Sequence, residues 1–345
     1  MPSEKRSNKG GLAEEALRSY FNSIGYYTVR GVPFEYSGYT LTDVDLFLYL
    51  KASSISRTRI NVDIKRKRTP QAMERIFWAK GLQEVLGLDS CVVATTDKRF
   101  ETVQFGRAHG VVVLDGHFMQ RVLSYSPEKD NRVSEEEFLK IIDLRSIVQS
   151  SIRLKTEYEE SKKLFLTDLN FNGCNKFLGK IGFMLQEYQA ISGVSEPVSR
   201  LLYALISYFL ISLDYVSRLF SYRSADERKQ EMSEGLKYGE SGRCRVEEIS
   251  KIAVTLVEQS TAGNSFVKNS LTDEIKRQMD DYPAEVLVEY FGKPENQKNM
   301  FNDARYFEDK AYSISLVTPV DLDARQKGIV ALLCDFHGMD RKKII

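Results

Sequence analysis

The chain has few of the residues from which cross-links and metal centres are commonly built. Its four cysteines form no Cys-x-x-Cys pair and lie far apart, at Cys91, Cys174, Cys244 and Cys334. This spacing is typical of reduced thiols in a cytoplasmic protein and argues against a zinc finger. The three histidines show no three- or four-residue spacing and lie at His109, His117 and His337. We therefore expect no histidine-based metal site, and structural roles for the first two histidines.

Long apolar runs and a nucleotide-binding loop are also missing. The most apolar run, 201–213, has about half to two-thirds of the roughly 20 residues that a membrane span needs, so we interpret it as a buried helix. The chain begins with the polar sequence MPSEKRSNKGG, which predicts a flexible tail over residues 1–10 and no signal peptide. No GxxxxGK[ST] sequence is present, so any ATPase would have to be a separate subunit.

A strong charge of one sign is absent from the chain as a whole, because 49 Lys and Arg residues face 48 Asp and Glu residues. The distribution is nevertheless uneven. Residues 1–125 hold 18 basic and 13 acidic side chains, a net of +5, and the other residues hold 31 and 35, a net of −4. The basic excess therefore coincides with the segment that carries the most informative pattern.

That pattern lies between Thr42 and Lys65, where two apolar runs flank a polar turn and predict a β-hairpin. Asp45 opens the first run, and Asp63 and Lys65 lie two residues apart in the second. Residues two apart in a strand point to the same face, and the hairpin would bring Asp45 beside them. Two carboxylates and a lysine at one sheet edge can hold a divalent cation against a phosphodiester, which favours metal-dependent nucleic-acid cleavage.

The periodicity of the first part of the chain predicts alternating helices and strands. The expected elements are a helix at 11–25, a strand at 26–30, the hairpin, a helix from Thr69-Pro70 to 86, a strand at 90–95, a helix at 100–109 and a strand at 111–114. This order predicts an α/β domain with a mixed sheet flanked by helices. Beyond a capping box at Ser134–Glu137 the signals are helical, so we expect an α/β domain at 11–127 and an all-α domain at 128–345. The second domain would serve oligomerisation, specificity or partner docking.

The arrangement over about residues 11–125 resembles the PD-(D/E)xK nuclease superfamily, with its restriction-endonuclease-like fold. The resemblance rests on an acidic first helix (AEEAL), the step GYYTV, an aspartate opening a strand, the sequence Asp63-Ile64-Lys65, and the later strands SCVVATTD and VVVLDG. These later strands are similar to the Mrr and Holliday-junction-resolvase branch. The proline that names the superfamily is absent, because Thr42 precedes Asp43 and Val44 precedes Asp45.

The resemblance implies a nuclease that uses Mg²⁺ or Mn²⁺. Asp45, Asp63 and the backbone carbonyl of Ile64 would supply hard oxygen ligands. Lys65 would hold or activate the attacking water and stabilise the developing charge.

Two positions of this site stay open. Asp43 competes with Asp45, which we favour because the apolar strand continues directly after it. Glu14 competes with Glu15 for the acidic position of the first helix. We favour Glu14, because it borders the packed face of that helix, whereas Glu15 is expected to point to solvent beside Arg18.

A basic cluster extends from the second strand of the hairpin into the helix expected after it. It comprises Arg57, Arg59, Lys65, Arg66, Lys67, Arg68, Arg75 and Lys80. A nuclease needs such a patch beside its scissile site, so we predict nucleic-acid contacts by Arg66, Lys67, Arg68, Arg75 and Lys80. We expect the neighbouring Phe77 and Trp78 in the core rather than as platforms for bases.

The favoured function is a two-domain endonuclease that cuts DNA, with prokaryotic defence or restriction as its setting. One alternative is an RNase or a structure-specific junction nuclease, and another is an inactive module that binds nucleic acid or scaffolds a partner. We expect a cytoplasmic homo-oligomer without membrane contact, and an ATPase or another defence subunit as a possible partner. The apolar segment Leu201–Val216 would lie either at a dimer interface or deep in the second core.

Overall fold

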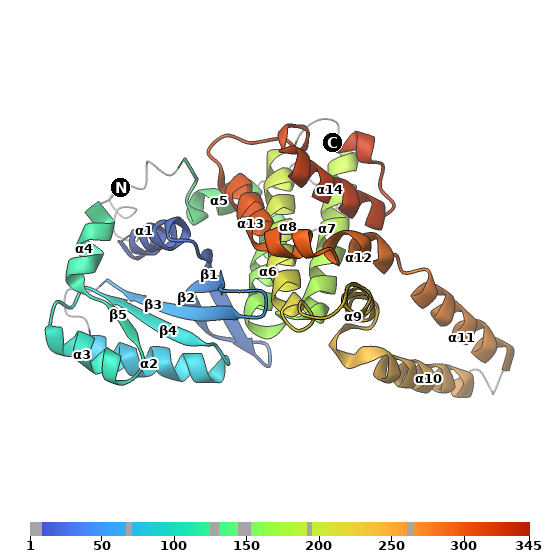
Figure 1. Ribbon diagram of the computed structural model, residues 1–345, viewed down its shortest axis with the longest axis horizontal. Helices are drawn as coiled ribbons and strands as arrows, with labels where there is room; N and C mark the ends of the chain where they lie inside the picture. The colour runs from blue at the N-terminus through green and yellow to red at the C-terminus, as the bar shows by residue number, and fades with distance from the viewer. Residues whose placement is uncertain (1–8, 67–70, 125–130, 144–152, 192–194, 261–264) are drawn as a thin grey trace. The chain divides into compact units, whose positions relative to one another are not determined.

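The structure is a computed structural model that describes residues 9–66, 71–124, 131–143, 153–191, 195–260 and 265–345 (Figure 1). These residues form two compact units. The first comprises the chain up to Thr167 with Ser195–Tyr203 and Glu308–Val317, and the second comprises Asp168–Val194, Ala204–Phe307 and Thr318–Ile345.

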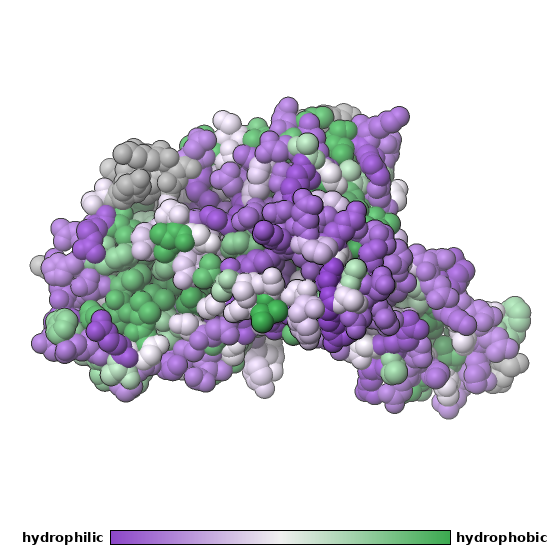
Figure 2. Space-filling view, in the orientation of Figure 1, coloured by the Kyte–Doolittle hydropathy of each residue, from purple (hydrophilic) through white to green (hydrophobic). Residues whose placement is uncertain are grey.

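The first unit contains the predicted mixed sheet. Within its described residues the sheet has five strands in sequential order: β1 (Tyr27–Tyr36), β2 (Tyr39–Lys51), β3 (Arg57–Lys65), β4 (Ser90–Thr95) and β5 (Val112–Leu114). The pairs β1–β2 and β2–β3 are antiparallel, and β3–β4 and β4–β5 are parallel. β1 and β2 extend further than predicted because Ser37 and Gly38, with φ of 50° and 81°, join them in a tight turn. The sheet ends at the short β5, and Figure 2 shows apolar side chains gathered over β4 and β5.

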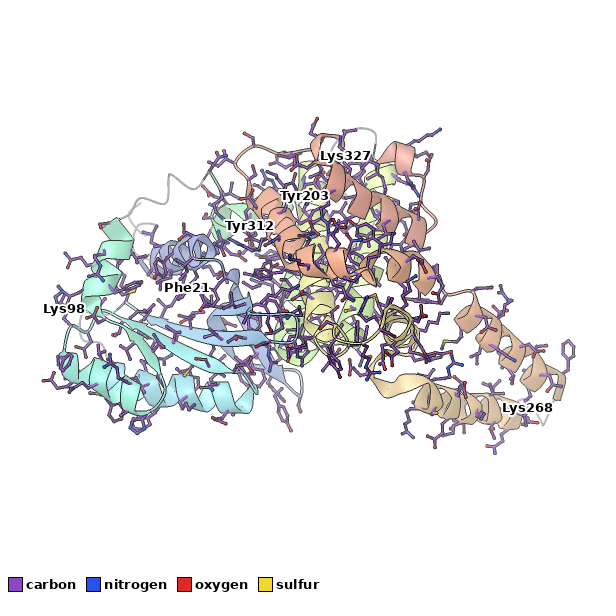
Figure 3. All side chains as sticks on the ribbon, viewed as in Figure 1. Phe21, Lys98, Tyr203, Lys268, Tyr312 and Lys327 are labelled. Carbon is purple, nitrogen blue, oxygen red and sulfur yellow. The ribbon has the colours of Figure 1, made fainter. Side chains whose placement is uncertain are left out.

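Helices cover both faces of this sheet, as the order of elements predicts. On one face, α1 (Lys9–Ser23) and α4 (Gly116–Ser124) bury an apolar cluster with Leu46, Leu48 and Val62, and Phe21 points from α1 into it (Figure 3). On the other face, α2 (Ala72–Val85) packs on β4 and α3 (Phe100–Ala108) packs on β5. The start predicted for α2, Thr69-Pro70, lies outside the described residues.

α4 was not predicted, since Asp115-Gly116 resembles a turn. Asp115 instead caps a helix, because its carboxylate accepts a hydrogen bond of 2.8 Å from the N–H of Phe118. A side chain at Gly116 would lie only 2.5 Å from the carbonyl oxygen of Thr96, so the close approach of helix and strand requires glycine.

The predicted domain boundary at residue 128 differs from the division of the compact units. α5 (Glu135–Ile142) and α6 (Leu154–Thr167) belong to the first unit, and the expected capping box joins Ser134 and Glu137. The reason is packing: the ring of Phe165 lies 5.4 Å from that of Phe47 in β2. Helical periodicity marks α5 and α6 as helices, but it does not show that they cover a sheet.

The remaining part of the chain is helical, as predicted for the second domain. Its helices are α7 (Phe171–Ala190), α8 (Glu196–Ser217), α9 (Ala225–Tyr238), α10 (Gly242–Ser260), α11 (Ser265–Asp280), α12 (Ala284–Phe291), α13 (Pro294–Tyr312) and α14 (Ala324–Phe336), with short 3-10 turns at Gly239–Ser241, Pro319–Asp321 and Arg341–Lys343. Among the described helices only α8 is long and apolar enough to cross a membrane, and 94% of its most apolar window is buried within the protein. This is the environment of a core helix in a soluble protein, so of the two positions considered for Leu201–Val216 the structure favours the core.

Candidate active site

The hairpin brings Asp45 and Asp63 to neighbouring strands. The β2–β3 pairing ends with Leu46 opposite Val62, and the two aspartates are the next residues along each strand. Leu46 and Val62 face α1, so alternation places the aspartates on the opposite face. The carboxylate of Asp45 accepts a hydrogen bond of 2.6 Å from the backbone N–H of Ile64. The Asp45 side chain thus replaces a backbone carbonyl of β2 as the hydrogen-bond acceptor for β3, at the point where the backbone pairing of the two strands ends.

Asp63 is almost fully buried and forms an ion pair with Arg75 of α2. Its exposed fraction is 6%, and its carboxylate accepts hydrogen bonds from Nε of Arg75, at 2.7 Å, and from Nη2. Arg75 was predicted to contact nucleic acid, whereas here its Nε and Nη2 are directed at a carboxylate. A two-pronged ion pair of this kind fixes the orientation of both side chains.

Asp45 lies in an electrostatic environment that resists its ionisation. Burial and the nearby charge of Glu14 raise the pKa of Asp45 to about 6, although the Ile64 N–H, Arg75 and Lys65 act in the opposite direction. The charges of Glu14 and Lys65 therefore both act on the Asp45 carboxylate, in opposite directions. The competing Asp43 is exposed, opposite Pro33 of β1, so the structure favours Asp45.

The acidic residues of α1 share one arginine of β1. Glu14 accepts a hydrogen bond of 2.7 Å from Nε of Arg30, and Glu15 accepts one of 2.6 Å from Nη1. The prediction that Glu15 and Arg18 point to solvent is wrong, because their side chains are only 12% and 2% exposed and pair with each other at 2.6 Å. The N–H of Glu135 in α5 also donates to Glu15 at 2.9 Å, so α5 covers this side of α1.

A buried charge network in the first unit supports this arrangement. Glu135 accepts hydrogen bonds from Lys162 at 2.9 Å, Tyr158 at 2.8 Å and Tyr312 at 2.6 Å, and it pairs with Arg18. Burial opposes the ionisation of Glu135, but the charges of Lys162 and Arg18 outweigh it and lower its pKa to about 2. The partners come from segments distant in sequence, so no local pattern could have revealed the network.

A pocket of about 280 Å³ lies beside the candidate site and is lined by Lys65, Gln71, Glu74, Arg75 and Trp78. The prediction that Phe77 and Trp78 lie in the core is wrong, because they are 63% and 47% exposed. The buried stripe of α2 instead consists of Ala72, Ile76, Ala79 and Gln83. Two alanines in this stripe allow α2 to pack closely on the sheet, and the large aromatic side chains lie beside it.

The basic cluster divides into separate groups. Arg66 is exposed at the end of β3, and Lys67 and Arg68 lie outside the described residues. Lys80 donates to Gln83 at 3.0 Å on the surface of α2. Arg57 and Arg59 begin β3 at the end remote from Lys65, and they donate to backbone carbonyls in the adjoining turns, including those of Ser56 and Gly87.

A further carboxylate, Asp97, follows β4. It accepts hydrogen bonds from Arg99 and from the hydroxyl of Thr102, and the bonds from Arg99 contribute most to lowering its pKa to about 2. These contacts join Asp97 to the first turn of α3, so we assign it a structural role.

The donors at the candidate site fit a hard cation that is bound by few protein ligands. Among the described residues no group of three or more His, Cys, Asp or Glu side chains forms a closed metal site. Mg²⁺ commonly uses one or two carboxylates, completed by waters and substrate phosphates. Asp45 and Asp63 provide these carboxylates. The Ile64 carbonyl points to the same side of β3 as its N–H, which faces Asp45. The positive charge of a bound cation would also stabilise the ionised form of Asp45, which burial and Glu14 disfavour.

Comparison with models of known protein families found no match, and comparisons with curated proteins and with solved structures found none. The functional interpretation therefore rests on the geometry and chemistry of the residues described above.

Proposed function

We propose that the protein is a metal-dependent endonuclease that hydrolyses phosphodiester bonds of DNA, and that its first unit has a restriction-endonuclease-like fold. The observation that carries the proposal is the grouping of Asp45, Asp63 and Lys65 where the β2–β3 pairing ends. The order α1-β1-β2-β3-α2-β4 and the mixed sheet agree with the fold that the resemblance implies. Defence or restriction is the proposed setting, with a separate ATPase or another defence subunit as a possible partner.

Each residue of the site has a proposed role. Asp45, Asp63 and the Ile64 carbonyl hold Mg²⁺ or Mn²⁺, which when bound neutralises phosphate charge and lowers the pKa of water. Lys65 donates to the scissile phosphate and stabilises the charge that develops on it. Glu14 borders Asp45 and contributes negative charge that favours a cation at this position.

Arg75 gives the site a second feature. Its guanidinium holds Asp63 in place before substrate binds, through two hydrogen bonds. The same planar group can bind a phosphate through two parallel hydrogen bonds. An incoming phosphate would therefore draw Arg75 towards itself and release Asp63 as a ligand.

The direct test is cleavage of plasmid, linear duplex, single-stranded DNA and tRNA with Mn²⁺ and with EDTA. Asp63→Ala and Lys65→Ala should each remove most of the turnover, because the residues act as a unit. Lys98→Ala is a matched control, since this exposed lysine donates to Gln120, does not line the pocket and is not among the predicted nucleic-acid contacts. Full activity of Asp63→Ala would refute the assignment, and preferential cleavage of tRNA would favour the RNase alternative.

The pairing of Asp63 with Arg75 also favours a second candidate function, a module that binds nucleic acid without cutting it. In that case Arg75 would neutralise Asp63 permanently, and Mn²⁺ would bind neither the free protein nor its complex with DNA. Calorimetry with Mn²⁺, with and without an uncleavable phosphorothioate oligonucleotide, separates the two functions. Mn²⁺ binding in either state supports the nuclease, and its absence in both supports the binding module.

A further inference from the structure

Trp78 is the one tryptophan of the chain, and its position is unusual for so large an apolar side chain. It is 47% exposed on α2, although a buried indole would contribute a large apolar area to the core. Its ring lines the pocket that also contains Lys65 and Arg75. The aromatic surface is therefore next to the cations that we assign to phosphate binding.

The surroundings of Trp78 suit one component of a nucleotide in particular. The guanidinium carbon of Arg75 lies 5.7 Å from the centre of the indole ring. The amide of Gln71 and the carboxylate of Glu74, joined by a hydrogen bond of 3.2 Å, add polar groups to the same pocket. An aromatic face beside polar side chains can take a flat, polar-edged ring, while neighbouring cations bind the phosphate attached to it.

We infer that Trp78 is a stacking platform for an unpaired nucleobase next to the scissile phosphate, so that the substrate class is nucleic acid with single-stranded or unstacked nucleotides at the cut. This inference rests on the proposed function for the role of the neighbouring phosphate. Bases within a continuous duplex are covered on both faces by their neighbours, so an exposed indole can stack only on a base that has left the helix. Stacking is largely independent of base identity, because every base has a flat aromatic face.

The neighbouring Phe77 provides a matched control. It is 63% exposed on the same helix, but its ring packs edge-on against Phe105 at 5.5 Å and it does not line the pocket. Phe77→Ala therefore removes an exposed aromatic side chain from α2 without removing the proposed platform.

The experiment uses the tryptophan fluorescence of the protein, excited at wavelengths where its 18 tyrosines absorb little, so that the emission reports on Trp78 alone. The protein is titrated in EDTA with oligothymidine, oligouridine and a blunt duplex, so that no cleavage takes place. We expect both single strands to quench and shift the emission, and the duplex to leave it unchanged. Stronger binding of either single strand identifies DNA or RNA as the preferred source of the base.

Variants separate stacking from charge. With a labelled oligothymidine, Trp78→Ala should weaken binding about 5- to 100-fold with an unchanged salt dependence, and Trp78→Phe should retain most of the affinity. Lys65→Ala should lower the salt slope by about one unit, because it removes a phosphate contact. Phe77→Ala should bind as the wild type does.

Three results would overturn the inference: equal quenching by duplex and single strand, wild-type affinity of Trp78→Ala, or equal losses in the Trp78→Ala and Phe77→Ala variants. Because binding is measured without a divalent metal, the outcome is independent of the nuclease assignment. Quenching by single strands without cleavage in Mn²⁺ would support the stacking role of Trp78 and refute the nuclease assignment. Cleavage without quenching would support the nuclease assignment and refute the stacking role.

Discussion

The carboxylate of Asp45 accepts a hydrogen bond of 2.6 Å from the backbone N–H of Ile64, and this contact links the β2–β3 hairpin to the candidate metal site. The hydrogen bond continues the β2–β3 pairing at the point where the backbone hydrogen bonds end. It also orients the Asp45 carboxylate, and burial together with the charge of Glu14 raises the pKa of this carboxylate to about 6. The residue that completes the hairpin is therefore also a carboxylate that a bound cation would stabilise in its charged form.

The first prediction concerns stability without metal. Because the pKa of Asp45 is raised on folding, ionisation of this group weakens the folded state as the pH rises through about 6. Asp45→Asn keeps an acceptor for Ile64 but carries no charge. In EDTA it should be more stable than the wild type by up to about 3 kcal/mol near pH 8, and by about half as much near pH 5. Urea unfolding at both pH values measures the difference, and a less stable variant at both would contradict it.

A second prediction is competition between protons and metal. Asp45 must lose its proton to bind a cation, so Mn²⁺ affinity should fall by nearly tenfold for each pH unit below about 6. Calorimetric titration between about pH 5 and pH 7 measures the slope. Asp45→Asn should bind Mn²⁺ weakly and without this pH dependence. A wild-type affinity that is flat over this range would exclude Asp45 as a ligand.

The parts of the site that could be predicted from the sequence depend on short-range geometry. Period-two alternation placed Asp63 and Lys65 on one face, and the hairpin brought Asp45 beside them. The mistaken predictions concern residues whose surroundings come from distant segments. Glu15 is covered by α5, which follows it by more than a hundred residues, and helical periodicity within α1 contains no information about that contact.

Trp78 is the opposite case, because it was predicted to be buried and is exposed. Its size favours burial, but α2 lies close to the sheet through Ala72, Ile76 and Ala79, which leaves no room for an indole between them. The assignment of α5 and α6 to the first unit could not be predicted for the same reason. Phe165 of α6 packs against Phe47 of β2, which is distant in the sequence.

A third prediction concerns Arg75. Its removal frees both oxygens of Asp63 and takes a positive charge from the neighbourhood of Asp45. Arg75→Ala should therefore bind Mn²⁺ about tenfold more tightly than the wild type, while its affinity for DNA decreases. Arg75→Lys keeps the charge but not the two parallel hydrogen bonds, so its Mn²⁺ affinity should lie between those of the wild type and Arg75→Ala. Unchanged Mn²⁺ affinity in Arg75→Ala would place the metal away from Asp63.

The fourth prediction tests the buried network of the first unit. Glu135→Gln leaves Lys162 buried without the carboxylate that it pairs with and leaves Arg18 paired with Glu15 alone, and breaking a buried ion pair in this way typically destabilises a protein by about 3–5 kcal/mol. Urea unfolding monitored by Trp78 fluorescence reports on this unit, because Trp78 belongs to it. Glu160→Gln is the control, since this glutamate pairs with Lys163 at the surface of the same unit and its side chain is 51% exposed. Equal stability of the two variants would contradict the role given to Glu135.

The last prediction concerns the proposed homodimer, which would supply two active sites if both strands of a nucleic acid are cut. The apolar helix α8 was one candidate for its interface, but Leu205 and its neighbours are fully buried. A charge at Leu205 would have to be buried without a partner, so Leu205→Asp should abolish cooperative unfolding of the second unit rather than give a folded monomer.

Ile252→Asp is the matched substitution, because Ile252 is 54% exposed on α10 of the same unit and should tolerate a charge without unfolding. Circular dichroism and light scattering at micromolar concentration measure folding and mass for both variants. A folded, monomeric Leu205→Asp protein beside a dimeric wild type would show that α8 forms the dimer interface after all. A monomeric wild type that still makes double-strand breaks would exclude the dimer as a requirement for cleavage.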